Sequence, residues 1–219
     1  MKITENETLE TYKSLYESAR KYGEKSINCD TIKKLWKKKD YIIVKRVNTP
    51  EKIPAVYIFI KNGRTGKSEP NKVWFTFFEL EGRCGKSYVG MMNNKLFMLK
   101  SHVFDRFIER HGWAGGREEC EDYFLLKMVL LYCDTDEYTR EVNIAFDDGM
   151  LLGHYIDEMF VIRTYINISD MYNNQKIKTK YQQMKLKEAK LCAEYIFNPV
   201  FAAVLDKLEN SKQVGEITK

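Results

Sequence analysis

FDDGMLLGHYIDEMFVIRTYI, residues 146–166, is the stretch that decides the fold of this chain. It contains the end of one mostly apolar run and the whole of two more. Asp148-Gly149 joins the first run to the second, and Asp157-Glu158 joins the second to the third. Because Asp-Gly between apolar runs is a strong signal for a β-hairpin, the stretch predicts three antiparallel strands joined by tight turns.

Two helices are predicted before these strands. Over 101–112, apolar side chains recur at helical spacing and share one face: Phe104, Phe107 and Ile108. Ser101 is expected to cap the N-terminus of this helix, and Gly112 lies where a C-terminal glycine belongs. The second helix is predicted over 118–133, where the apolar C-terminal half is typical of a buried segment.

The regions on either side complete the predicted fold. Residues 6–39 are expected to form two helices, whereas 40–99 holds short runs rich in Val, Ile, Phe and Tyr that are typical of strands. Downstream, 169–196 predicts a long basic helix that starts at Ser169, and a short helix follows it. We therefore expect an α+β fold, an antiparallel sheet with helices packed on it. Its C-terminal core has the order strand, helix, helix, three strands and helix.

Three parts are predicted along the chain. Residues 1–94 form an N-terminal helical and strand region without an assigned role, and 95–210 form the α+β core that carries the candidate site. Residues 211–219 are expected to be a disordered tail.

The composition is that of a globular protein with a slight basic excess. Hydrophobic residues make up 44% of the chain, which is enough for a sizeable core. The 36 basic and 31 acidic residues leave a net charge of +5, which permits an anionic partner such as RNA without requiring one. The first residues lack the apolar core of a secretory signal, and no run approaches the ~18 apolar residues of a membrane helix. We therefore expect a cytoplasmic protein without a membrane partner.

No cofactor and no metal are predicted. The five cysteines are widely spaced and form no CxxC motif, which argues against a zinc site or a disulfide framework. GRTGKS (63–68) and GRCGKS (82–87) resemble the end of a phosphate-binding loop, but Lys61 and Leu80 occupy the position of its first glycine. We interpret both stretches as hairpin turns.

The predicted helix over 101–112 carries the first set of candidate site residues. His102, Arg106 and Arg110 are four residues apart, so they form one stripe along this helix, with Asp105 and Glu109 beside it. An ordinary solvated face with i,i+4 charge pairs would have this pattern. A surface that binds phosphate would have it as well.

The second set lies on the predicted strands. Arg163 and Thr164 interrupt an otherwise apolar strand, and alternation places Arg163 on the same sheet face as Val161 and Tyr165. Pairing about the preceding turn places Tyr155 against Met159 or Phe160, and so His154 near Val161. We therefore expect a diagonal approach between His154 and Arg163.

These residue types suit metal-free RNA cleavage. Histidine can transfer a proton near neutral pH, and arginine stays charged and can bind two phosphate oxygens. No carboxylate cluster or HExxH motif points to a metal. The catalytic candidates are His102, His154 and Arg163. The candidates for nucleic-acid binding are Arg106, Arg110, Thr164, Lys176 and Lys180.

The order of elements over 95–190 and the phrase SHVFDRFIERHG resemble the barnase- and RelE-like ribonuclease toxins. In small families related to those toxins a histidine is followed by paired arginines, and here His102, Arg106 and Arg110 match that pattern. Their closing strands carry a basic or polar residue that faces the RNA phosphate, and Arg163 and Thr164 match it. The resemblance implies a metal-independent endoribonuclease, toxin-like or associated with phage or defence, with RNA as substrate and an antitoxin as a protein partner.

Two other functions stay open at this point. The chain could be a non-enzymatic nucleic-acid-binding protein that uses the lysines of 176–190. It could also be a protein-interaction module, because the aromatic side chains of 73–78 cannot all face one core from a single strand.

Overall fold

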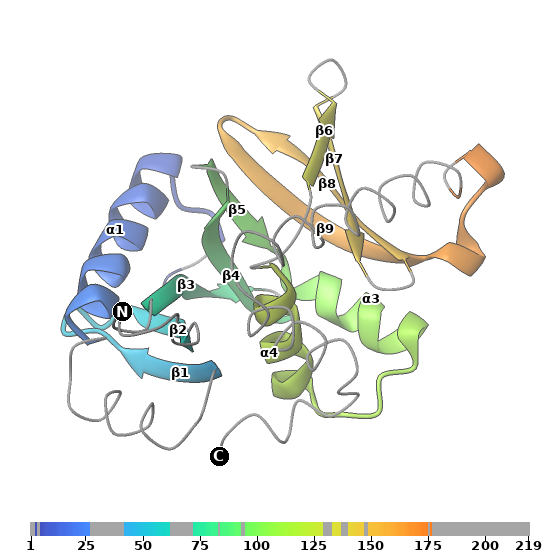
Figure 1. The fold of residues 1–219 in the computed structure, drawn as a ribbon. Coiled ribbons are helices and arrows are strands. Elements are labelled where there is room, and N and C mark those ends of the chain that lie inside the picture. The colour runs from blue at the N-terminus through green and yellow to red at the C-terminus, as the bar shows by residue number, and fades with distance from the viewer. Residues whose placement is uncertain are drawn as a thin grey trace, which may run out of the picture.

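The computed structural model confirms the α+β fold, with helices packed on a mostly antiparallel sheet (Figure 1). It describes residues 3, 5–26, 42–61, 72–82, 84–92, 95–128, 133–136, 140–146, 149–174 and 176. The helices are α1 (Leu9–Ser26), α3 (Ser101–His111) and α4 (Arg117–Met128), with a 3-10 turn at Ile168–Asp170. The strands are β1 (Ile42–Asn48), β2 (Pro54–Lys61), β3 (Lys72–Gly82), β4 (Gly85–Met92), β5 (Lys95–Leu99), β6 (Cys133–Asp136), β7 (Glu141–Phe146), β8 (Gly149–Ile156) and β9 (Met159–Asn167).

The nine strands of the described residues form one sheet, in the order β1-β2-β3-β4-β5-β9-β8-β7-β6. Two antiparallel meanders, β1 to β5 and β6 to β9, meet where β5 runs parallel to β9. The boundary that we expected near residue 94 therefore falls inside a continuous sheet, between the paired strands β4 and β5. The ranges 1–94 and 95–210 both contribute strands to it.

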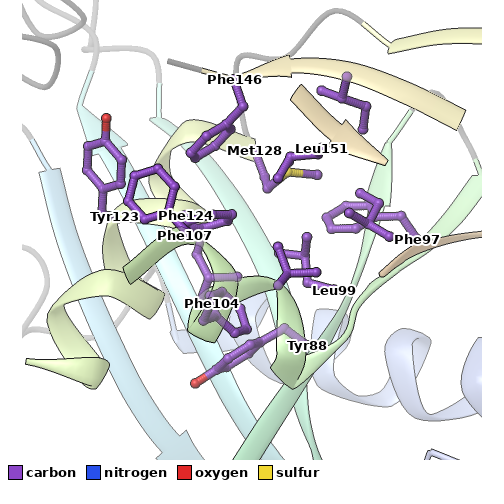
Figure 2. Close-up of a cluster of buried hydrophobic side chains, with 14 of the residues drawn as sticks. Tyr88, Phe97, Leu99, Phe104, Phe107, Tyr123, Phe124, Met128, Phe146 and Leu151 are labelled. Atoms are coloured by element: carbon purple, nitrogen blue, oxygen red, sulfur yellow. The ribbon is translucent and has the colours of Figure 1, made fainter. Parts of the chain in front are cut away.

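The two faces of the sheet carry separate cores. On the face that we call the α3 face, Phe104 and Phe107 of α3 pack with Phe124 of α4 (Figure 2). Ile162 and Tyr165 of β9 belong to the same core. On the opposite face, the α1 face, Tyr12 of α1 packs in a second core that also contains residues of β3, β4, β5 and β9. The sheet separates the two cores, which have no residue in common. Because successive side chains of a strand point to opposite faces, the position of a residue along its strand decides which core it joins.

Strand β3 shows this division most clearly. Phe77 points to the α3 face and Phe78 to the α1 face, and both are buried. Helices cover both sides of this strand, which accounts for its two-sided aromatic pattern without an external partner.

Two local predictions need correction. Ser101 is the first helical residue and not the cap, because Lys100 precedes the helix and the Ser101 amide donates to Ser87 Oγ at 2.8 Å. The helix predicted over 118–133 corresponds to α4 (Arg117–Met128), but Cys133 belongs to strand β6. The apolar residues there do not distinguish a helix from a buried strand.

Other local predictions are confirmed or fall outside the described residues. Gly112 ends α3 in the left-handed conformation (φ 68°), and 82–87 forms the β3–β4 hairpin. Outside the described residues lie the second of the two helices predicted over 6–39, most of the helix predicted for 169–196, the hairpin turn at 63–68 and the tail at 211–219.

Candidate functional site

The polar side chains along α3 form hydrogen bonds largely with one another. Arg106 Nε donates to His102 Nε2 at 3.1 Å, and Arg106 Nη1 donates to Glu109 at 2.8 Å. These contacts span three or four residues of one helix, the spacing of ordinary exposed helix pairs. The geometry on α3 is therefore that of a solvated helix face.

Arg110 has a different partner from the rest of the stripe. Its Nη1 donates to the backbone carbonyl of Tyr165 at 2.6 Å. The bond ties the last turn of α3 to β9, which lies beneath it. Arg110 thus anchors the helix to the sheet, and one of its guanidinium donors is already used.

His154 and Arg163 lie on the other side of the sheet. His154 pairs with Val161 across β8 and β9, as predicted, and Val161 belongs to the α1-face core. Because directly opposed residues of paired strands share a face, His154 lies on the α1 face. The positive charge of Arg163 acts on His154, which is consistent with the expected diagonal approach.

A β-bulge sets the position of Arg163. Gly153 pairs with Ile162 and Leu152 pairs with Thr164, so Arg163 is the extra residue of β9 without a partner on β8. A Cβ atom at Gly153 would collide with the Val161 carbonyl and lie 2.9 Å from the Ile162 Cα. Only glycine allows this close approach of the backbones.

The bulge also overturns the alternation that we predicted for this strand. Tyr165 packs against Phe107 on the α3 face, so Arg163 does not share a sheet face with it. Arg163 itself is exposed, and Thr164 beside it is half-buried.

Two effects lower the pKa of the His154 imidazole below its usual 6.5. The larger is partial burial and the second is the charge of Arg163. Both disfavour the protonated ring, so the neutral form predominates at neutral pH. When the exposed guanidinium binds a phosphate of a ligand, the neutral imidazole beside it can accept a proton from a hydroxyl group next to that phosphate.

The structure does not bring the two sets of candidates together. Phe104 and Phe107 place α3 on one face of the sheet, whereas His154 and Arg163 belong to the other. His102, Arg106 and Arg110 therefore do not border the same hollow as Arg163. Of the candidate lysines, Lys176 lies just after the 3-10 turn and donates its amide to Tyr172, and Lys180 is outside the described residues.

Sequence reasoning missed a charged network between the sheet and α4. Arg46 of β1 donates to Glu79 at 2.7 Å, to the Tyr88 hydroxyl at 2.9 Å and to Asp122 at 2.5 Å. Tyr88 in turn donates to Glu121 at 2.5 Å. Its members come from β1, β3, β4 and α4, so no local pattern in the sequence could have revealed it.

The pKa of Arg46 reflects both its burial and its partners. Burial alone would lower this pKa, but the interactions with Tyr88, Asp122 and Glu79 outweigh burial and raise it. Burial raises the pKa of Asp122, against the charge of Arg46. All of these groups are engaged with one another, which is typical of a structural ion-pair network that holds α4 on the sheet.

Among the described residues, no group of three or more His, Cys, Asp or Glu side chains is arranged to hold a metal ion. Within the same part of the chain, no helix is both long and apolar enough to cross a membrane.

Comparison with known proteins adds no further constraint on the site. No family model matches the chain, and neither a curated protein nor a solved structure does so.

Proposed function

We propose that the protein is a metal-independent endoribonuclease that binds RNA on the α1 face of β8 and β9. The observation that carries the proposal is the approach of His154 to Arg163 on a face separate from α3 and α4. We place the enzyme in the cytoplasm, where its RNA substrate is found, and assign it a toxin-like or defence role.

The proposed reaction uses one side chain as the base and another to bind the phosphate. His154 takes the proton of a ribose 2′-hydroxyl, and the 2′-oxygen attacks the adjacent phosphorus. The bond from phosphorus to the 5′-oxygen breaks, and that oxygen takes a proton from solvent. Arg163 binds the non-bridging oxygens and stabilises the charge that develops on them, with the Thr164 hydroxyl beside it. The products are a 2′,3′-cyclic phosphate and a 5′-hydroxyl.

The test is cleavage of a defined RNA by the full-length protein in EDTA. Products should carry cyclic phosphate ends, and His154→Ala should lower the rate about 100-fold, because a positioned base contributes at least that much. His102→Ala is the matched control on the other face and should leave the rate within about twofold.

Three outcomes would overturn this assignment. A large loss of cleavage rate in His102→Ala, with no loss in His154→Ala, would show that the catalytic site lies on α3. Equal cleavage by the wild type and a His154→Ala/Arg163→Ala double variant would identify a contaminating nuclease. Binding without cleavage, weakened steeply by salt, would make the protein a non-enzymatic RNA-binding protein.

A further inference from the structure

A cavity of about 570 Å³ opens where α1, the start of β5 and the β8–β9 turn meet. Its volume is in the range of sites that take a small molecule or a few side chains. Met91 of β4 and Leu96 of β5, which pair across the two strands, supply its apolar lining. Charged residues of α1 and of the turn supply its rim.

One exposed apolar side chain, Met91, lines this cavity. Among the described residues, three large apolar side chains are exposed: Met91 at 36%, Ile156 at 41% and Tyr172 at 79%. Of these three, Met91 lines the cavity, whereas Ile156 and Tyr172 do not. An exposed apolar side chain at a hollow is typical of a protein-binding surface.

The two lysines of the rim are already engaged. Lys13 of α1 donates to Glu158 at 2.9 Å. Lys95 donates to the Tyr155 hydroxyl at 3.3 Å, and its ammonium lies 5.2 Å from the centre of that ring. The hydrogen bond and charge of Lys13, and then the charge of Lys95, lower the pKa of Glu158. Lys13 is therefore paired with a carboxylate, whereas Lys95 contacts the hydroxyl and ring of Tyr155.

The carboxylates of the rim are not all engaged. Glu17 accepts from Arg20 on the same helix, and Glu158 is bound by Lys13. Asp157 is exposed and makes no ion pair with any described residue. It lies in a two-residue turn with φ 52°, a conformation that aspartate adopts more readily than most residues. The opening therefore presents an unpaired negative charge beside an apolar lining.

We infer that this cavity is the docking site for a segment of a partner protein that presents an apolar side chain next to a lysine or arginine. The apolar side chain would enter between Met91 and Leu96, and the basic side chain would pair with Asp157. RNA is disfavoured as an occupant, because three carboxylates (Glu17, Asp157 and Glu158) line the cavity against two lysines. The inference does not depend on RNA cleavage.

The experiment is selection of a displayed library of random heptapeptides on the full-length protein. The enriched peptides should share an apolar residue adjacent to a lysine or arginine. In a methionine-methyl NMR titration, the enriched peptide should move the Met91 signal. Met91→Ser should weaken its binding about tenfold, as for a central apolar contact. Asp157→Asn should weaken it about threefold, as for an exposed charge pair.

The control and the contrary outcomes are equally specific. Tyr172→Ser, at the exposed aromatic side chain that does not line the cavity, should bind the peptide as the wild type does. Enriched peptides that lack a basic residue, or that bind equally to Met91→Ser, would overturn the inference. Self-association of the wild type that Met91→Ser abolishes would make a second copy of the chain the occupant instead.

Discussion

The polar stripe of α3 and the open strands β8 and β9 carry the same residue types in opposite circumstances. On α3, His102, Arg106 and Glu109 bond to one another. On the sheet, His154 and Arg163 lie close although the charge of one disfavours the charge of the other. The polar side chains of α3 bond to one another within the helix. Arg163, in contrast, is exposed and helps to keep His154 neutral, so a bound anion can pair with its guanidinium. The comparison teaches that a high density of His and Arg in the sequence is a weaker indication of a functional site than a charged side chain that can still bind a ligand.

The largest effect on stability is expected on the side of α3 that packs against the sheet. Phe107 is fully buried, and its ring centre lies 4.9 Å from that of Phe124 and 5.0 Å from that of Tyr165. Phe107→Ala should lower the free energy of unfolding by about 3–5 kcal/mol, measured by urea denaturation. His102→Ala, one and a half turns away on the outer side, should change it by about 0.5 kcal/mol or less. Similar losses in both variants would contradict the view of α3 as a structural helix.

The next effect concerns the guanidinium on the bulge. Arg163→Ala should lower the rate of RNA cleavage about 100-fold, because it removes the group that stabilises charge on the phosphate. Arg163→Lys should recover part of the loss, since lysine keeps the charge but not the two-pronged geometry. Arg106→Ala on α3 is the matched arginine and should keep the wild-type rate. An equal loss in Arg106→Ala would erase the distinction between the two regions.

A pH profile would sharpen the comparison further. Only the neutral imidazole can accept the proton, so the rate should rise with pH through the pKa of His154 and then level off. Since burial and Arg163 lower that pKa, the midpoint should lie below pH 6.5. Below the midpoint the rate should fall about tenfold for each pH unit. Arg163→Gln should move the midpoint upward; a midpoint above pH 6.5 in the wild type would exclude His154 as the base.

The smallest effects distinguish the arginines within α3. Arg110 donates a charge-assisted hydrogen bond to the Tyr165 carbonyl, so Arg110→Ala should lower the free energy of unfolding by about 1 kcal/mol. Among the described residues, the hydrogen-bond and ion-pair partners of Arg106 all lie within the helix, and Arg106→Ala should cost about 0.5 kcal/mol or less. Thermal unfolding of both variants side by side would test the order. The reverse order would show that the stripe has a partner of its own.

The sequence allowed prediction of the features that depend on residues close together in the chain. The Asp157-Glu158 turn fixed the register of β8 against β9, and the opposition of His154 and Val161 followed from it. The bulge at Arg163 escaped the prediction, although Gly153 inside a strand was a signal for it. Position 133 was placed in a helix because a short apolar run fits both helix and strand.

The features that sequence reasoning could not reach are long-range. Whether α3 and Arg163 share a side of the sheet depends on how β5 meets β9, and no local pattern encodes that choice. The Arg46 network joins residues that are separated by up to 76 positions. Both arise from tertiary packing alone.

The parallel contact between β5 and β9 has a consequence for the order in which the chain folds. Only three residue pairs join the two strands, and each pair is roughly 60 positions apart along the chain. During synthesis, β1 to β5 can assemble from local hairpins while β9 is still to be made. Until then the edge of β5, with the sequence KLFML, has no neighbour, and such an apolar edge promotes aggregation. Slow translation through 100–158 would therefore lengthen the interval in which the nascent protein needs a chaperone.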